Sequence, residues 1–496
     1  MASSLSSLTN YAEYAFPDLD LGDKRLDRRF AQVIQSSLQH PEKALPDKFH
    51  DPAAYFACLR LLNHPAVTHG KLLCCHQTAV LDRLECLGPA VVLLVHDTTE
   101  LDFSGHTTLA KDLGQIGNGG GKGFLCHNSI AFDPSALEIL GLVNQILHCR
   151  PRVGKDEPVA IKRERKSRES RLWLRAIDEI GPSPADKRWI DVCDRGADIF
   201  EFLQTLSDRR RHFIVRSSSN RALAKKQDDD VEDIPLEVVT TPGDANDESA
   251  IGGPPAELLA KPPHLLHELM RTIPAIGTWG VDVGATTKHS ARVALVHACA
   301  RQVKLNPPHV RKGEYRKETL TLWAIRVWEP TPPAGQDALE WMLLTDQEVS
   351  DAETLRRVAS WYEARWIVEE FHEGQKTGVG IEKLQLQDAG SLQAAIALLS
   401  VVAVALVNLR VAARDEEKAN QPARDYVPEL WMRVLSIQRY KEVRDMTVLE
   451  FSMALARLGG HLNRKLDGLP GWITLWRGWE RLHVMIEYEL SRARCV

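Results

Sequence analysis

The chain lacks the features that mark disulfide-rich, secreted and strongly charged proteins. Its nine cysteines are scattered along 496 residues and include no Cys-x-x-Cys pair, which argues against a structural zinc site and favours a reducing compartment. No cationic start followed by an apolar run is present, so we expect no signal peptide. The net charge of −5 argues against nucleic-acid binding by bulk charge. Any DNA contact therefore needs local basic patches.

Long apolar runs are also scarce. The longest, residues 394–407, has 14 residues and contains Ser400, which is short for a membrane span. We expect a buried core helix there and no membrane contact. The apolar content of 44% is ordinary for a globular protein, and the length allows one large domain with appendages or several domains.

Two apolar runs end in an acid. Residues 91–97 read as a central strand that is buried on both faces and ends at Asp97, and residues 189–194 read as a strand that ends at Asp194. The other elements expected in this part are strands at 124–132, 139–147 and 212–217, and helices at 167–180 and 198–206.

The composition changes between residues 219 and 335, which read as a β-rich insertion. Strands are expected at 291–303 and 319–329, and an acidic stretch rich in Pro and Gly covers about 227–263. A short buried strand is expected at 341–345, and helices then dominate to the end of the chain.

Residues 361–376 predict one amphipathic helix with four functional side chains on one side. Tyr362, Arg365, Glu369 and Lys376 fall inside an arc of roughly 60° at 100° per residue. An acid, two cations and a phenol at one place suit a phosphate and a metal ion. The alternative from these residues alone is an ordinary amphipathic helix with a solvated face.

Three carboxylates are candidates for one metal site. Asp97 and Asp194 end neighbouring strands of the expected sheet, and a helix packed on that sheet can add Glu369. Oxygen ligands suit Mg²⁺, and two such ions can support in-line phosphoryl transfer. Four competing acids are weighed against these three. Asp191 should face the other side of the sheet or be paired, and Asp102 follows the strand and could be a loop acid. Glu370 points elsewhere on the helix, and Glu373 stays possible as a second ligand.

A basic ridge is expected near the N-terminus, where residues 1–70 read as helical. Lys24 with Arg28, and Arg25 with Arg29, are spaced four residues apart on one helix. Such a ridge could meet DNA phosphates, and the alternative is a solvated helix face.

The order strand-Asp, two strands, helix, strand-Asp, helix, insertion, helix-Glu is that of the ribonuclease-H-like recombinases. The chain closely resembles the DDE cut-and-paste transposases of insertion-sequence family four, whose Tyr-Arg-Glu-Lys signature matches Tyr362, Arg365, Glu369 and Lys376. The other matching segments are 21–23, 96–99, 192–199, 213–217, 341–345, 456–460 and 475–480. The insertion is longer than in the family pattern, and residues 415–446 match it poorly.

The resemblance implies an α/β fold with a ribonuclease-H-like mixed sheet and a β-rich insertion, flanked by helical domains. It implies a helical DNA-binding domain at 1–70, a catalytic domain at 71–410 with the insertion at 219–335, and a helical dimerisation region at 411–496.

The resemblance also implies the role of each site residue. Asp97, Asp194 and Glu369 would bind two Mg²⁺ ions, for which Mn²⁺ could substitute. DNA would be contacted by Tyr362, Arg365, Lys376, Trp341, Arg216, Lys24, Arg25, Arg28 and Arg29. Trp341 would stack on a flipped base. From the residues alone, Trp341 could instead be core, Arg216 could pair with a strand-end acid, and Lys376 could be a solvated lysine at a helix end.

The implied reaction is cut-and-paste transposition. The enzyme would nick the transposon ends, form and reopen a DNA hairpin, and join the 3′ ends to target DNA. Its partners would be double-stranded DNA, as terminal inverted repeats and target, and a second copy of the chain, in the bacterial cytoplasm at the nucleoid. The alternatives are a non-catalytic DNA-binding regulator derived from a transposase and a stand-alone metal-dependent nuclease.

Overall fold

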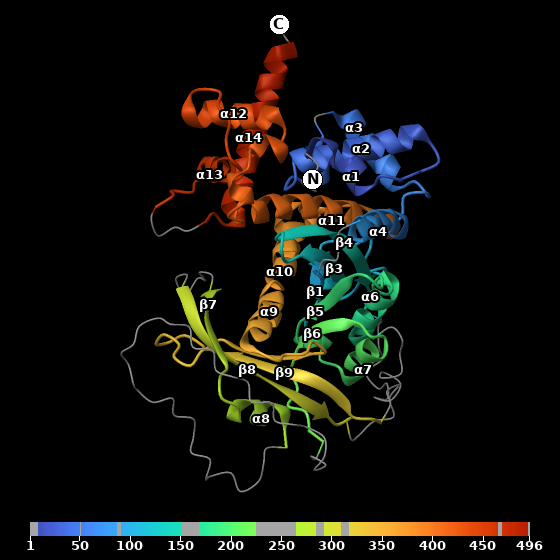
Figure 1. The fold of residues 1–496 in the computed structure, drawn as a ribbon. Helices are drawn as coiled ribbons and strands as arrows, with labels where there is room; N and C mark the ends of the chain where they lie inside the picture. Colours follow the sequence, from blue (N-terminus) through green and yellow to red (C-terminus); the bar gives the residue numbers. More distant parts are fainter. Residues whose placement is uncertain are drawn as a thin grey trace. The chain divides into compact units, whose positions relative to one another are not determined.

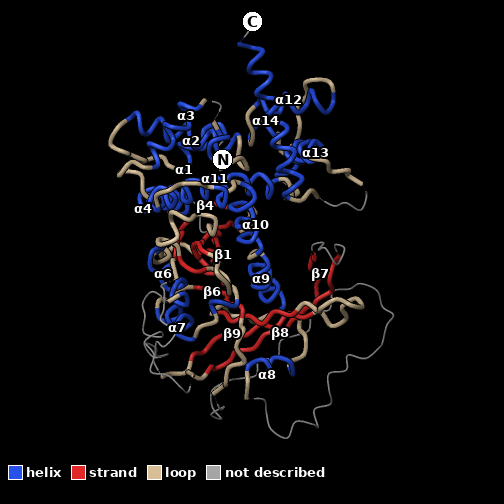
Figure 2. The backbone as a smooth tube through the Cα atoms, turned by 180° about the vertical axis from the view of Figure 1, so that it is seen from behind, coloured by secondary structure: helices blue, strands red, loops and turns tan. Residues whose placement is uncertain are grey.

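The computed structural model describes residues 8–49, 51–86, 91–150, 168–224, 264–283, 292–308, 317–464 and 469–494. The predicted acidic stretch at 227–263 lies outside the described residues. The fold is mixed α/β, with a large mixed sheet in the middle of the chain and helices toward both ends of the sequence, as Figures 1 and 2 show. This confirms the predicted fold class, because the sheet is consistent with a ribonuclease-H-like core.

Two compact units divide the chain. The first comprises residues 1–92, 97–180 and 366–496, and the second comprises 93–96 and 181–365. Each unit is described by itself.

The first unit begins with helices, as the sequence predicts. These are α1 (Tyr11–Ala15), α2 (Lys24–Gln39), α3 (Pro52–Leu62) and α4 (His69–Cys86). The side chains of Asp23 and Asp51 cap α2 and α3 by accepting a backbone N–H of the first turn, which satisfies a donor that has no partner inside the helix. α2 buries Phe30, Val33 and Ile34, so its opposite face carries the charges.

Four strands belong wholly or partly to the first unit: β1 (Val91–Asp102), β2 (Gly114–Gln115), β3 (Lys122–Asp133) and β4 (Glu138–His148). β3 pairs antiparallel with β2 and β4, and α4, α6 (Leu172–Ile180) and α11 (Ala389–Ala412) pack against β4. The predicted end of the first strand at Asp97 is wrong. β1 continues to Asp102 because its half-exposed second part still pairs in the sheet.

The second unit holds the rest of the sheet, in the order β1, β5, β6, β10, β9, β8, β7. β5 (Arg188–Cys193) and β6 (His212–Arg216) are parallel, and α7 (Phe200–Asp208) lies between them in sequence. The antiparallel strands are β7 (Gly277–Val283), β8 (Arg292–Leu305), β9 (Leu320–Trp328) and β10 (Glu340–Thr345). The β-rich character of the insertion is confirmed, whereas β7 and α8 (Leu266–Thr272) were not predicted.

The predicted single helix at 361–376 is wrong. The segment divides into the end of α9 (Ala352–Glu363), α10 (Trp366–Glu373) and a π turn, η6 (Gly374–Gly378). Ala364 and Arg365 separate α9 from α10, and the amide of Arg365 bonds to the carbonyl of Tyr362 at 3.0 Å. This tight turn shifts the helical phase, so the four signature residues do not share one helix face.

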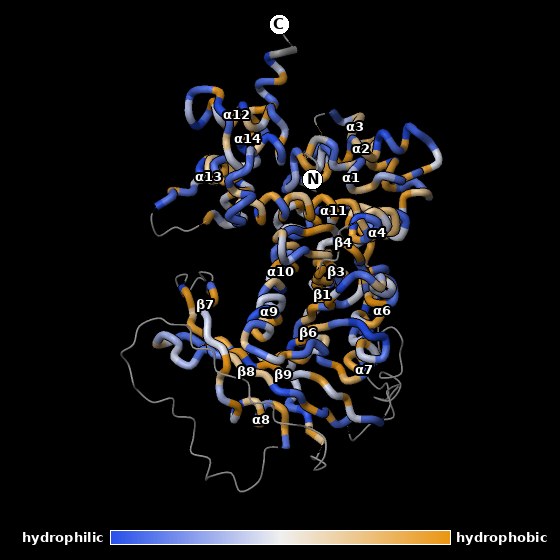
Figure 3. Tube along the Cα trace, viewed as in Figure 1, coloured by the Kyte–Doolittle hydropathy of each residue, from blue (hydrophilic) through white to orange (hydrophobic). Residues whose placement is uncertain are grey.

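The remaining helices of the first unit pack mainly on one another. They are α12 (Glu429–Tyr440), α13 (Val448–Leu458) and α14 (Trp472–Arg494). α13 and α14 approach closely at Gly459 and Gly478, where a Cβ would lie within 2 Å of a backbone oxygen. α11 is hydrophobic along its length (Figure 3). Among the described helices it is the one long and apolar enough to cross a membrane, and 89% of its most apolar window is buried in the protein, as predicted for a core helix.

Candidate functional site

Asp194 lies where the sequence places it, directly after β5. Its carboxylate accepts the Gly196 N–H at 2.9 Å and so begins a short turn, η4 (Arg195–Ala197). The side chain is half-buried. A carboxylate held at a strand end by its own backbone is set in one direction, which suits a ligand-binding role.

Asp97 lies within β1, and its carboxylate accepts the Thr98 N–H at 2.7 Å. The residues on either side are anchored: His96 bonds to Asp191 at 2.9 Å, and the Thr98 hydroxyl bonds to His127 at 2.8 Å. The backbone around Asp97 is therefore fixed on both sides.

Asp191 is paired, which confirms one of the two expectations for it. It is 1% exposed, and it accepts two hydrogen bonds from the Arg211 guanidinium at 2.7 and 2.8 Å and one from His96. Burial alone would raise the pKa of Asp191, but Arg211 and His96 hold it at about 2. Asp191 and Arg211 thus form a structural ion pair in the second unit.

Glu369 and its neighbour Glu370 differ in their contacts. Glu369 is an exposed residue in the first turn of α10, which packs against β3. Glu370 binds the Arg410 guanidinium and the Trp472 indole N–H, so it ties α10 to α11 and α14. Glu370 is therefore paired within the fold, whereas the choice of Glu369 as the site acid stays a prediction.

Three of the predicted DNA-binding residues come together in the second unit. The rings of Trp341 and Tyr362 meet edge to face with centroids 5.8 Å apart. Arg216 on β6 lies near the Tyr362 hydroxyl, and its guanidinium also donates to the carbonyl of Glu340 at 3.0 Å. Burial raises the pKa of Tyr362, while Arg216 and Arg365 oppose that rise. Tyr362 is buried rather than presented on a solvated face, contrary to the helix prediction.

Lys376 belongs to the first unit, in the π turn η6. It is half-buried, and its charge helps to lower the pKa of Asp102, after the larger effect of two hydrogen bonds from Ser104. Asp102 is the last residue of β1 rather than a loop acid. Arg365 is half-buried in the second unit, between α9 and α10.

A buried amide network anchors η6, and sequence reasoning missed it. Gln375 is fully buried and bonds to Asn128 on β3 at 3.1 Å and to Ser400 on α11 at 2.8 Å. Gln145 on β4 closes the network through bonds of 2.9 Å to both Asn128 and Ser400. Polar residues inside otherwise apolar strands were the signal that could have revealed it.

Lys48 is a second missed anchor. It is 2% exposed, and its ammonium group donates to the carbonyls of His40, Pro41 and Val379, the last of which directly follows η6. Burial lowers the pKa of Lys48 to about 7. The segment between α2 and α3 is thereby joined to the end of η6 within the first unit.

The predicted basic ridge is present on α2. Lys24, Arg25 and Arg28 are exposed and Arg29 is half-buried, opposite the apolar face of the helix. The ridge therefore offers positive charge to solvent over one turn of helix, where a nucleic-acid phosphate could approach.

The three predicted ligands supply carboxylate oxygens, the donor type that Mg²⁺ prefers. Across the described residues, however, no group of three or more His, Cys, Asp or Glu side chains could hold a metal ion. Asp97 and Glu369 belong to the first unit and Asp194 to the second. The metal ions expected from the sequence stay a prediction.

Comparison with protein families identifies the N-terminal segment. Residues 9–67 match the model of the transposase DNA-binding family. The match spans α1, α2 and α3, and it includes the basic ridge. This segment is therefore similar to a transposase DNA-binding domain, which supports a transposase-related, DNA-binding function for the chain.

Proposed function

We propose that the chain is a DDE transposase of the cut-and-paste type, of insertion-sequence family four. The observation that carries the proposal is the match of residues 9–67 to transposase DNA-binding domains. The exposed cations of α2 lie within that match. This segment would recognise the terminal inverted repeats, and its phosphate contacts would set the protein on the DNA.

Asp97, Asp194 and Glu369 would form the catalytic set. The proposal is supported by their elements. His96, just before Asp97, bonds to Asp191 in β5, and Asp194 directly follows β5. α10 with Glu369 packs on β3, the other neighbour of β1. Bound Mg²⁺, or Mn²⁺ in its place, would activate the attacking oxygen and stabilise the leaving oxygen. The carboxylates would hold the ions and orient them.

Around these acids, aromatic and cationic side chains would hold the DNA. The Trp341 and Tyr362 rings with Arg216 combine a stacking surface with a guanidinium, which suits a base turned out of the duplex and its phosphate. Arg365 and Lys376 would bind further phosphates beside the cleaved bond.

Two of the four chemical steps would hydrolyse a phosphodiester bond, and the other two would exchange one phosphodiester bond for another. Water attacks phosphorus at the transposon end and releases a 3′-hydroxyl. That hydroxyl attacks the opposite strand, which forms a hairpin and releases the flanking DNA, and a second water reopens the hairpin. The 3′-hydroxyl finally attacks target DNA. A dimer would hold two ends together in the bacterial cytoplasm, at the nucleoid.

A second function is favoured by one fact: the matched family describes DNA binding alone and covers residues 9–67. A non-catalytic regulator derived from a transposase would keep that segment and bind the repeats without cutting them.

The test uses full-length protein, Mg²⁺ and linear DNA that carries the genomic sequences flanking its gene. A transposase cuts both ends in pairs and yields hairpin-ended fragments. Binding without cleavage would support the regulator and overturn the proposal, and cleavage that ignores the end sequences would support a stand-alone nuclease. Fragments with permuted flanking sequences are the control.

A further inference from the structure

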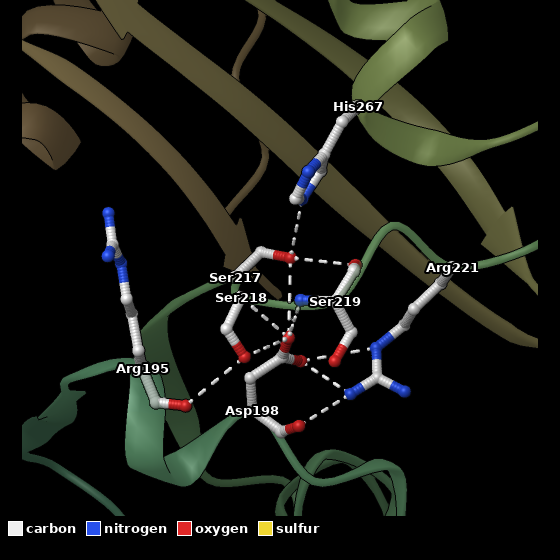
Figure 4. Close-up of polar contacts among 7 residues, drawn as sticks. All are labelled: Arg195, Asp198, Ser217, Ser218, Ser219, Arg221 and His267. Atoms are coloured by element: carbon white, nitrogen blue, oxygen red, sulfur yellow. Dashed lines mark hydrogen bonds and ion pairs between the residues drawn. The ribbon is translucent and has the colours of Figure 1, made fainter.

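One buried carboxylate outside the predicted set joins two segments of the second unit. Asp198 directly follows η4, and its side chain is fully buried. Figure 4 shows Asp198 with the residues gathered around it. One carboxylate oxygen accepts the N–H groups of Ser218 and Ser219 at 2.8 Å each, and the other accepts the Arg221 guanidinium, with the Nε atom at 3.1 Å.

The partners of Asp198 all lie in the segment after β6. Arg221 also donates to the backbone carbonyl of Asp198 at 2.7 Å, so this arginine binds both the side chain and the backbone of Asp198. The Ser218 hydroxyl reaches the carbonyl of Arg195 in η4 at 3.5 Å. Two loops that are far apart in sequence are thus joined by one acid and one arginine.

These two loops carry predicted site residues. Asp194 caps the start of η4, and the segment after β6 begins next to Arg216. Because β5 and β6 are parallel, both loops leave the same edge of the sheet. The Ser217 N–H bonds to the carbonyl of Met342 at 2.7 Å, which extends the junction to β10 beside Trp341.

The insertion closes the cluster from the other side. His267 on α8 lies 3.0 Å from the Ser217 hydroxyl, which in turn lies 3.4 Å from Asp198. Both oxygens of the Asp198 carboxylate therefore accept hydrogen bonds, and its charge is balanced by Arg221 at 10% side-chain exposure. Such a saturated acid cannot act as a metal ligand without giving up these bonds.

We propose that Asp198 is a positioning residue for the reaction, which fixes the Asp194 turn against the Arg216 segment. This role rests on the proposed function. Replacing the carboxylate by an amide would set an NH₂ group against Arg221 or against the serine N–H groups. Both loops would then become more mobile. Asp194, the predicted metal ligand, and Arg216, the predicted phosphate contact, would no longer be held in a fixed position relative to each other.

The test compares the full-length Asp198→Asn protein with wild type and with Glu329→Gln. Glu329 is a matched control because it is also a buried carboxylate bound by one arginine, Arg292, in the same unit. Hydrogen exchange of the backbone amides of residues 217–224 measures how often this junction opens, and it requires no catalytic activity. Faster exchange there is expected in Asp198→Asn and not in Glu329→Gln, and unchanged exchange overturns the junction.

Cleavage then separates positioning from folding. With equal DNA binding, Asp198→Asn should cleave about 10–100-fold more slowly and need more Mg²⁺ for half-maximal rate. Wild-type rate and Mg²⁺ dependence would overturn the positioning role. Should Asp198→Asn fail to fold, Arg221→Lys, which keeps the charge and removes the fork, is expected to give a smaller decrease of the same kind. An absence of cleavage by the wild-type protein would contradict the proposed function, whereas hydrogen exchange would still test the junction.

Discussion

At the residue scale, Asp191 and Asp194 are three positions apart but belong to different environments. Asp191 is enclosed by Arg211 and His96, whereas Asp194 is half-buried and bonds to its own turn. A carboxylate that is fully committed to buried partners holds the fold, and one at a strand end is available for chemistry.

Asp191→Asn should therefore destabilise the protein strongly. It leaves the Arg211 guanidinium buried without a carboxylate, and losing one partner of a buried ion pair is expected to destabilise the fold by about 3–5 kcal/mol. The free energy of unfolding, measured with urea, should fall by that amount at pH 7, and much less in Asp194→Asn. Because the pKa of Asp191 is lowered to about 2, its stabilising effect should be present above pH 4 and be lost as pH falls through 2. Equal stability of the two variants would contradict this assignment.

Lys48 gives the opposite kind of pH dependence. Its pKa is lowered to about 7 in the folded protein, so the unfolded chain binds more protons between pH 7 and 10. The stability of wild type should rise over that range by up to about 1.4 kcal/mol per pH unit relative to Lys48→Met. Urea unfolding at pH 7 and 9 measures this difference. Lys71→Met, which changes an exposed lysine that bonds to the Asp20 carbonyl, should keep the wild-type profile. Parallel profiles of wild type and Lys48→Met would refute the burial effect.

At the scale of elements, the sequence predicted most strands and missed where two elements end. The apolar run stops at Asp97, but β1 continues to Asp102 with half-exposed side chains, because hydropathy reports burial and not backbone pairing. The turn between α9 and α10 was not predicted, because hydropathy does not report where the helical backbone is interrupted either. The apolar positions Trp361, Ala364 and Ile367 keep helical spacing across the turn, and no proline or glycine marks Ala364 and Arg365.

The π turn η6 depends on its amide network. Gln375→Met should cost about 1–3 kcal/mol, because it leaves buried groups of Asn128 and Ser400 without that partner. If the network places Lys376, DNA cleavage should fall while binding of the terminal repeats stays the same. Thermal unfolding and single-turnover cleavage measure the two effects.

Gln77→Met is the matched control for Gln375→Met, since Gln77 is half-buried on α4 and bonds once, to the carbonyl of Glu179. It should change stability by less than about 0.5 kcal/mol. A Gln375→Met protein as stable as this control would show that the network contributes little.

At the scale of the whole molecule, the described N-terminal segment belongs to the first unit with α11 and α14. The Tyr11 hydroxyl donates to Val401 at 2.7 Å, and the Trp479 indole donates to Leu38 at 3.3 Å. The segment that matches transposase DNA-binding domains is thus packed on the protein's own core helix. Long-range contacts of this kind have no sequence signal, because they join positions hundreds of residues apart.

The basic ridge should dominate the salt dependence of DNA binding. Replacing Lys24, Arg25 and Arg28 together by Gln should make the negative slope of log K against log salt shallower, by about 0.9 for each DNA phosphate that the variant no longer neutralises. Fluorescence anisotropy at several salt concentrations measures the slope. Arg433 and Arg439 are exposed cations on α12 and provide the control pair. An equal change in slope for both sets would mean that the ridge has no special role.

The central claim is that Asp97, Asp194 and Glu369 carry one phosphoryl-transfer reaction. The most direct measurement is single-turnover cleavage of repeat-bearing DNA, with Mg²⁺, by Asp97→Asn, Asp194→Asn and Glu369→Gln, beside Glu373→Gln four residues further along the chain. The account predicts that the first three bind DNA normally and cut nothing, while Glu373→Gln still cuts. Cleavage by Asp97→Asn, Asp194→Asn or Glu369→Gln at the wild-type rate would contradict it, whatever Glu373→Gln does.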